Sequence, residues 1–372
     1  MTLLEASAKS LVKCSIFLNR LLLGRISGRL PYNHLESLEA CNDSKVLSHI
    51  KDMRELYPEE IIEYSVSDSM PSYVRRKKAI DRQMLFHIAN ATVSPASGAV
   101  WIDETYLLGQ SIGSLKRILT WARMLHEPLM GRTTLSIDGP VIPVASLPYF
   151  EWMIEGVPNL MAALEHYPDA KLLIHDNCPS YITDTVELIL KDNGKDRLVR
   201  ARRPVKLKEV VFVEISSNAG FMRPTELALV RQLKQVASHK IATKQPSKIY
   251  ISRSLRPARL MANESELENK LTDMGFSIVH AEKMSMPEQI NMFSNAKYIV
   301  APHGAGLANM IFAPNQVNVV EIFPDVFFND CCILLSALLN NEHRIVFCNP
   351  KPGTPNGLIP VDSVLQEIES MS

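Results

Sequence analysis

The sequence predicts an α/β protein built from two doubly wound parallel sheets. Short apolar runs typical of buried strands alternate with helix-like segments from about residue 97 to residue 323. A polar segment at 242–248, which contains a proline, interrupts this alternation and indicates a joint between two units. The chain of 372 residues is long enough for two domains that each bury a core. Two Rossmann-like halves therefore explain the pattern better than one large sheet.

The segment before the joint predicts the first Rossmann-like unit. Apolar side chains recur at helical spacing over residues 149–166, and an apolar strand follows at 171–176. A second helix is expected at 179–192, because an Asn-Gly pair follows it directly and ends it. Further elements are expected as strands at 97–103, 197–201 and 209–215 and as a linking helix at 225–239.

The segment after the joint repeats the alternation. Each strand-like run, rich in isoleucine and valine, leads into a helix-like segment. We expect strands at 248–252, 276–281, 297–301 and 317–323 and helices at 263–274, 286–295 and 306–312.

The N-terminal part of the chain predicts a helical extension. Residues 1–70 are read as largely helical, and the charged run at 74–78 is typical of a solvated face. Residues 1–25 combine leucines with four basic side chains in an amphipathic pattern, which fits either contact with a membrane surface or packing on the protein itself. The chain thus divides into an extension at 1–70, a first Rossmann-like domain with a linking helix at 71–240, and a second at 241–372.

Composition excludes several function classes. Acidic and basic residues balance at 40 each, so no global field attracts nucleic acid. Six cysteines without a Cys-x-x-Cys pair indicate neither a disulfide framework nor a zinc site and favour a reducing compartment. No run of about 20 apolar residues is present to span a bilayer. We expect no bound metal, because Asp-x-Asp and zinc-like ligand spacings are both missing.

The run from Ala301 to Asn309, APHGAGLAN, predicts a ligand-binding turn. It follows a buried strand and opens a helix, and glycines at 304 and 306 let a ligand approach the backbone. Free N–H groups at the start of a helix favour an anion such as phosphate. The alternative is a tight turn with a capping histidine, His303.

Arginines follow the strand at 248–252, at positions 253, 256 and 259. In an open parallel sheet the carboxyl ends of the strands face one crevice, so these cations and the turn at 301–309 are expected to meet there. Arginine presents a rigid fork of donors that matches phosphate. Glu321 interrupts an apolar strand, and a buried carboxylate needs a partner, either a ribose diol or an arginine.

Together these motifs resemble glycosyltransferase family 61. The resemblance rests on Tyr250-Ile-Ser-Arg253, Arg259, Asn263-Glu264, the turn at 303–309 and Val320-Glu-Ile-Phe-Pro324, in the order and spacing of the family. It implies the two-domain GT-B fold, with two Rossmann-like domains facing across a crevice, and inverting, metal-independent transfer of a sugar from a nucleotide-sugar donor. It also implies that residues 71–240 hold the acceptor and residues 241–372 hold the nucleotide.

The resemblance also points to a catalytic base. In the family a His-Trp pair begins a helix and an acid follows four residues after the histidine; here Glu151 replaces that histidine and Glu155 is the acid. Carboxylates one helical turn apart crowd together, which raises the pKa of one of them and suits a general base. We expect Glu155 to be the base and Glu151 the alternate, against a purely structural role at a helix start.

Donor binding is assigned to the second domain. His303 is expected to donate to a phosphate oxygen or to the donor sugar, and Ser285, with Glu282, to lie near the nucleotide base. The expected donor-site residues are Arg253, Arg259, Ser285, Gly304, Ala305, Gly306, Leu307, Asn309 and Glu321.

The resemblance implies transfer of a hexose or pentose to a glycan or lipid-linked glycan, and we expect this to take place in bacterial capsule or lipopolysaccharide synthesis. We expect a cytoplasmic enzyme, with peripheral contact to the inner membrane through residues 1–25. Two alternatives remain: a polysaccharide pyruvyltransferase, which needs the basic cluster but no nucleotide pocket, and a sugar-binding scaffold that has lost its base.

Overall fold

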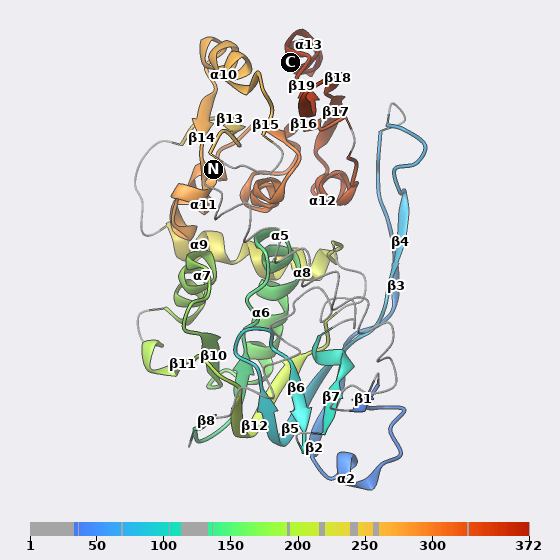
Figure 1. The fold of residues 1–372 in the computed structure, drawn as a ribbon, viewed down its shortest axis with the longest axis vertical. Coiled ribbons are helices and arrows are strands. Elements are labelled where there is room, and N and C mark those ends of the chain that lie inside the picture. The colour runs from blue at the N-terminus through green and yellow to red at the C-terminus, as the bar shows by residue number, and fades with distance from the viewer. Residues whose placement is uncertain are drawn as a thin grey trace.

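The computed structural model has an α/β fold with two lobes (Figure 1). The predictions for residues 1–25, Arg256 and Arg259 lie outside the described residues. The structure describes residues 33–35, 37–67, 70–103, 105–112, 133–135, 137–191, 194–215, 220–238, 245–255, 260–325 and 327–371.

A ten-stranded mixed sheet forms the first lobe, which is the lower one in Figure 1. Its strands run in the order β1-β7-β6-β5-β12-β9-β10-β11, with β2 paired to β5 and β8 paired to β12. The bounds are β1 Asn33–Leu35, β2 Ile50–Tyr57, β5 Gln83–Val93, β6 Val100–Ile102, β7 Tyr106–Leu108, β8 Thr133–Thr134, β9 Val141–Pro143, β10 Lys171–His175, β11 Leu198–Ala201 and β12 Val205–Val213.

The prediction of a doubly wound parallel sheet is wrong for this lobe. β5 pairs antiparallel with β2, β6 and β12, whereas β9, β10 and β11 are parallel. An apolar strand buried on both faces has the same sequence pattern in either orientation, so periodicity alone did not distinguish them. The prediction that residues 1–70 are largely helical is also wrong for the part that the structure describes. Within 33–63 the described residues form three strands and one four-residue helix, α2 (Ser44–Leu47).

The predicted helix at 149–166 is confirmed, with an irregular turn inside it. It begins as α5 (Tyr149–Glu151), widens to the π-helical turn η3 (Trp152–Gly156) and continues as α6 (Val157–His166). A Cβ on Gly156 would overlap the Trp152 ring, so the turn requires glycine there. The other described helices of this lobe are η1 (Gly109–Ser111), α7 (Ser180–Leu190), η4 (Lys195–Arg197), α8 (Pro224–Arg231) and α9 (Leu233–Ser238).

The second lobe is the predicted parallel α/β unit. Five parallel strands run in the order β14-β13-β15-β16-β17, so the second strand lies outside the first and the remaining three lie on its other side. The strands are β13 Lys248–Ile251, β14 Ser277–Val279, β15 Tyr298–Pro302, β16 Asn318–Phe323 and β17 Glu342–Phe347, and the helices are α10 Glu264–Asp273, η5 Ala281–Lys283, α11 Met286–Phe293, η6 Ala305–Phe312, α12 Cys331–Leu338 and α13 Val361–Ser370.

Most element bounds in this lobe agree with prediction to within two residues. The segment after β15 differs in kind, since η6 is a 3-10 helix. The chain also continues past the last predicted strand through β17 and a small two-stranded sheet, β18 (Asn349–Lys351) with β19 (Thr354–Leu358).

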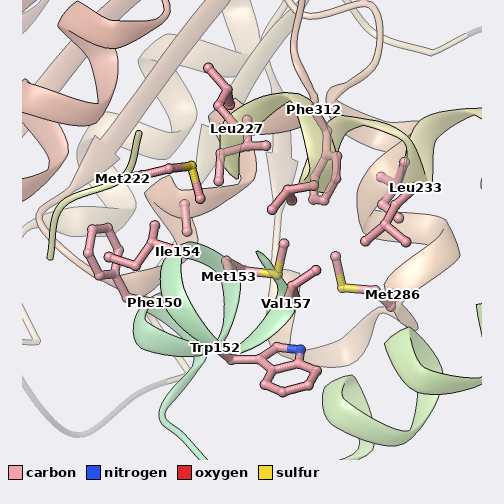
Figure 2. Packing of buried hydrophobic residues seen from close by; sticks show 14 of the residues in the cluster. Phe150, Trp152, Met153, Ile154, Val157, Met222, Leu227, Leu233, Met286 and Phe312 are labelled. Atoms are coloured by element: carbon pink, nitrogen blue, oxygen red, sulfur yellow. The ribbon is translucent and has the colours of Figure 1, made fainter. Parts of the chain in front are cut away.

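One apolar core joins the two lobes. A single cluster of buried side chains runs from the helices of the first lobe to the inner face of the second sheet, and helices α8 and α9 lie between the lobes (Figure 1). Figure 2 shows Met153 and Val157 of the first lobe close to Phe312 and Met286 of the second. The lobes are therefore packed against each other through an apolar contact.

A β-hairpin links the lobes a second time. β3 (Glu60–Glu63) and β4 (Lys77–Ile80) form a two-stranded arm that rises beside α12 (Figure 1). Ile62 and Ile80 pack on Leu334 of α12, and the guanidinium of Arg75 binds the carboxylate of Asp330. The charged run at 74–78 is thus partly a docking segment. No described helix is long and apolar enough to cross a membrane.

Candidate functional site

The crevice between the lobes opens at the point where the strand order of the second sheet reverses. β14 lies on one side of β13 and β15 on the other, so the segments that follow β13 and β15 diverge and leave a gap above the sheet. Ligands of open α/β sheets bind outside the carboxyl ends of the strands at such a point. A cleft of about 770 Å³ occupies this position, lined by the ends of β13, β14 and β15 and by Tyr149 and Tyr181 of the first lobe.

Arg253 and Gly304 form the floor of this cleft. Arg253 follows β13, and its guanidinium lies against the Cα of Gly304, where a Cβ would overlap Nη1. The next glycine, Gly306, is close to β13 as well, because a Cβ there would lie 3.1 Å from Ile251 Cγ2. The sequence prediction that the cationic segment and the turn meet at one crevice is therefore correct for Arg253.

A buried carboxylate fixes the backbone at Arg253. Oε1 of Glu264 accepts hydrogen bonds from the Arg253 N–H at 2.7 Å and from the Tyr250 hydroxyl at 3.0 Å. Burial raises the pKa of Glu264, although these hydrogen bonds oppose the rise. Glu264 was expected only as part of the family motif, and the structure shows that it positions the segment that carries Arg253.

Asn309 joins the two walls of the cleft rather than lining it. Its side chain is fully buried, accepts a hydrogen bond from the Tyr149 hydroxyl at 2.7 Å and donates one to Gln289 Oε1 at 3.0 Å. The Tyr149 ring meets the Tyr181 ring edge to face at 5.1 Å. Burial raises the pKa of Tyr149, so its hydroxyl stays protonated and keeps donating.

His303 faces a different partner from the predicted phosphate. Its ring is 5% exposed, and Nδ1 lies 2.6 Å from Oε1 of Glu321. The ring stacks on Phe323 with 4.8 Å between centroids and meets Phe327 at 5.2 Å. The backbone of the turn lines the cleft at Pro302 and at residues 304–307, whereas the imidazole packs toward β16.

Glu321 has histidines where an arginine or a ribose was expected. Its carboxylate is fully buried, with Oε1 on His303 and Oε2 3.2 Å from Nε2 of His343. Burial alone would raise the pKa of Glu321, but the contacts with both histidines outweigh it and leave that pKa below its usual range. Glu321 is therefore a buried anion held between two imidazoles.

Among the described residues, His303, Glu321 and Cys332 place ligand atoms within 4.8 Å of one another, a spacing that permits a metal ion. Two ligands of one tetrahedral zinc would lie roughly 3.3 Å apart, which is longer than the 2.6 Å between His303 and Glu321. Hydrogen bonding with Cys331 and burial raise the pKa of the Cys332 thiol well above its usual value, which disfavours a thiolate ligand. The geometry is that of a hydrogen-bonded pair.

Glu155 lies apart from the cleft that Arg253 lines. It is buried in η3 and lines a small cavity of about 50 Å³ inside the first lobe. Glu155 was expected to lie one α-helical turn from Glu151, but the segment between them is a wider π-helical turn. The charge of Glu155 instead acts on another carboxylate, that of Glu226. Burial, with the charge of Glu155 as a smaller cause, raises the pKa of Glu226 to about 7. Glu151 is half-buried at the start of the helix.

The other predicted donor-site residues divide between the cleft and the helix ends. Ala305, Gly306 and Leu307 line the cleft, and so does Glu282. Ser285 caps α11, since its hydroxyl donates to Glu288 at 2.7 Å and its N–H does the same. Its predicted contact with the nucleotide base stays a prediction.

Sequence reasoning missed the aromatic wall and one histidine of the site. Tyr149 and Tyr181 belong to helices that the sequence placed, but only the packing of the lobes brings them to the cleft. His343 lies on β17, a strand beyond the last one predicted. The short apolar run Ile345-Val346-Phe347, rich in strand-forming residues, was a usable signal for that strand.

Part of the chain is similar to known proteins. The model of the family Glycosyltransferase 61 matches residues 149–320, a little under half of the chain, from the first turn of α5 to β16. Over 81 residues the chain is 35% identical to beta-1,2-xylosyltransferase XAX1 of Oryza sativa subsp. japonica. That match covers 22% of this chain and 14% of the relative, so the chain spans a small part of the relative's length. Residues 149–320 are therefore similar to a glycosyltransferase 61 domain.

Proposed function

We propose that the protein is a glycosyltransferase that moves a pentose from a nucleotide-sugar donor to a glycan acceptor. The observation that carries the proposal is the cleft at the reversal point of a parallel sheet, where Arg253 packs on the Gly304 backbone. The family match supports the reaction class, and the similarity to a protein named as a xylosyltransferase supports a pentose, with xylose as the first to test.

In this proposal the second lobe holds the nucleotide and its diphosphate. Arg253 supplies a bidentate cation, and Gly304, Ala305 and Gly306 supply a surface without bulky side chains. In this proposal these groups stabilise the charge that develops on the departing nucleoside diphosphate in place of a metal ion. Direct attack by the acceptor hydroxyl inverts the anomeric centre. The two lobes then act as the two halves of a GT-B enzyme.

The acceptor and the cellular setting are part of the same proposal. The resemblance to capsule and lipopolysaccharide transferases favours a glycan or lipid-linked glycan of a bacterial surface polysaccharide, made in the cytoplasm. Contact with the inner membrane through residues 1–25 belongs to this setting. A pyruvyltransferase would bind phosphoenolpyruvate at the same basic cleft and no nucleotide.

A thermal-shift screen tests the proposal. The purified chain is heated with UDP, GDP, CMP, their sugar conjugates and phosphoenolpyruvate, each with and without EDTA. A ligand at about 100 times its Kd adds roughly 2.7 kcal/mol to stability. We expect one nucleotide and its pentose conjugate to raise Tm regardless of EDTA. A shift with phosphoenolpyruvate alone would favour the pyruvyltransferase, and a shift lost in EDTA would contradict the metal-independent chemistry.

Arg253→Ala supplies the site control for the screen. We expect it to weaken nucleotide binding by roughly 1.5–3 kcal/mol, the range for a hydrogen bond to a charged group. Arg82→Ala is the matched control, since Arg82 is an exposed arginine of the first lobe that pairs with Glu39. Unchanged nucleotide affinity in Arg253→Ala would remove this arginine from the donor site.

A further inference from the structure

Two tyrosines of the first lobe form a corner in the wall of the cleft. Tyr149 and Tyr181 both line the cleft, and their rings meet at 88° with 5.1 Å between the centroids. Rings at right angles present apolar surface in two directions. The proposed donor site uses Arg253 and Gly304 of the second lobe and leaves this corner without a ligand.

The hydroxyl groups of both tyrosines are bonded within the protein. The Tyr149 hydroxyl donates to the buried Asn309 at 2.7 Å, and the Tyr181 hydroxyl donates to the backbone oxygen of Leu147 at 2.7 Å. Each ring is therefore held by its polar end. The surface that the corner adds to the cleft is that of the ring carbons.

The corner is also rigid. Pro148 directly precedes Tyr149 at the start of α5, and Pro179 precedes α7, of which Tyr181 is the second residue. Both prolines line the cleft as well. Proline fixes the backbone angle φ, and a tyrosine has few rotatable bonds, so little conformational entropy is lost when a ligand binds here.

The first-lobe wall of the cleft carries no charged side chain among the residues that the structure describes. It consists of Pro148, Tyr149, Pro179, Ser180 and Tyr181, whereas the charged lining residues, Arg253 and Glu282, belong to the second lobe. An ionised group held against such a wall would lose water without gaining a partner. A neutral ring with an apolar face fits it better. A pyranose whose hydroxyls are all equatorial has such a face, because its axial hydrogens project from it.

The position of the corner indicates which sugar ring it meets. In the proposed function the diphosphate leaves from the floor made by Arg253 and Gly304. In a direct displacement the acceptor hydroxyl approaches the anomeric carbon from the side opposite the leaving group. α5 and α7 lie at the end of the first lobe that meets the second lobe, across the cleft from that floor (Figure 1). The acceptor ring is therefore expected against the tyrosines.

We propose that the corner of Tyr149 and Tyr181 is the acceptor subsite and that it stacks a neutral pyranose whose hydroxyls are all equatorial; this rests on the proposed function. The acceptor is then a neutral glycan that ends in a ring of the xylose or glucose type, and a uronic acid is selected against. Tyr181 determines this preference together with Tyr149.

Saturation-transfer NMR tests the class of ligand. The chain is mixed with methyl β-xyloside, methyl β-glucoside or methyl β-glucuronide, each with and without UDP. The last two differ only in a carboxylate in place of a primary alcohol. We expect saturation on the axial hydrogens of one face of both neutral glycosides, and binding of the glucuronide roughly fivefold weaker or more. Equal or tighter binding of the glucuronide, or no signal from the neutral pair, would overturn the proposal.

Substitutions of Tyr181 test the stacking. We expect the Kd of methyl β-xyloside to rise roughly fivefold to tenfold in Tyr181→Ala, which loses the ring, and less than about twofold in Tyr181→Phe, which keeps it. Tyr181→Leu, apolar but not aromatic, replaces the alanine variant if that does not fold. Tyr73→Ala is the control, since Tyr73 is exposed and meets Phe328 edge to face outside the cleft. Unchanged binding in Tyr181→Ala, or an equal loss in Tyr181→Phe, would contradict stacking.

Calorimetric titration with UDP distinguishes the acceptor from the nucleotide base. We expect the UDP affinity of Tyr181→Ala to stay within about threefold of the wild type. A fall of about tenfold or more would show that the ring stacks on the base, and the acceptor assignment would be wrong. If the wild type binds no nucleotide at all, the proposed function fails. The glycoside measurements without UDP then still decide whether the corner binds a sugar.

Discussion

At the scale of single residues, the cleft depends on a glycine, Gly304, that has no Cβ. Gly304 has an extended backbone that any residue adopts, with φ at 170°, so conformation does not explain the glycine. The reason is space, because the Arg253 guanidinium occupies the position of a Cβ. The pairing of a cation with a glycine thus defines the floor of the cleft.

Gly304→Ala tests that pairing. The atom displaced is the far end of a flexible side chain, so we expect a stability change under about 1 kcal/mol. Arg253 must move, and nucleotide binding should weaken by roughly 1.5–3 kcal/mol, as when a hydrogen bond to a charged group is lost. Calorimetric titration with UDP and thermal unfolding measure the two effects. The control is Ala308→Gly, because Ala308 is buried in η6 and does not line the cleft. It shows how much nucleotide binding changes when only stability is lost. Gly353→Ala is less suitable as a control, because Gly353 has a positive φ.

Glu226 makes stability depend on pH. Its folded pKa is about 7, raised by burial above the ordinary value of 4.5. The folded state then holds a proton that the unfolded state releases, so this stability is fully present below pH 4.5 and is lost as pH rises toward 7. We expect a loss of up to about 3 kcal/mol between pH 4.5 and pH 8.

Glu226→Gln checks the assignment. The amide oxygen still accepts the Arg223 N–H that the carboxylate now binds at 2.6 Å, so the helix cap is kept. Urea unfolding of both proteins at pH 5 and pH 8 should show a flatter dependence in the variant. Equal dependence in the two proteins would assign the effect to another group.

At the scale of elements, α5 and η6 are joined by one polar contact in an apolar surrounding. The Tyr149 hydroxyl donates to the buried Asn309, which in turn donates to Gln289 of α11. Three elements from both lobes therefore share one chain of hydrogen bonds. The π turn after α5 contains Glu155, whose side chain is buried.

Tyr149→Phe should destabilise the fold by about 1–3 kcal/mol, because Asn309 Oδ1 stays buried without its donor. Chemical denaturation measures the change. Tyr106→Phe is the matched control: its hydroxyl binds Asp43 at 2.7 Å at a partly exposed position, where water replaces it. We expect the control to lose less than about 1 kcal/mol. Equal losses of stability in the two variants would show that the hydrogen bond between α5 and η6 contributes no more than an exposed one.

At the scale of the whole molecule, the two sheets share one core. The largest apolar cluster includes side chains of α6, α8, α11, η6 and the second sheet, and the β3–β4 hairpin adds a second contact on α12. Lobes joined by such a core do not unfold one at a time. Packing between the lobes thus contributes to the separation of the cleft walls in this structure.

Phe312→Ala tests this coupling. Phe312 is fully buried in η6 and lies close to Leu233 and Met153 in Figure 2. Removing a buried phenylalanine ring costs about 3–5 kcal/mol. We expect one cooperative transition in calorimetry for both proteins, with tryptophan fluorescence following the same shift although Trp152 belongs to the first lobe. Two separate transitions would show that the lobes fold independently.

The sequence by itself determined the part of the second lobe from β13 to β16 and the floor of its cleft. Strands at 248–323 are short apolar runs bounded by turns, and parallel strands bring their carboxyl ends to one edge of the sheet. From that rule alone Arg253 and Gly304 were expected to meet, and they do.

Only the tertiary structure decided the rest. Strand direction in the first sheet depends on partners far along the chain, so periodicity did not show that β5 and β12 are antiparallel. The partner of Glu321 was also undetermined, because His303 and His343 lie 18 and 22 residues away and meet it only across neighbouring strands. Residue types in the sequence indicated the candidate site residues, and packing between distant segments determined which of them are in contact.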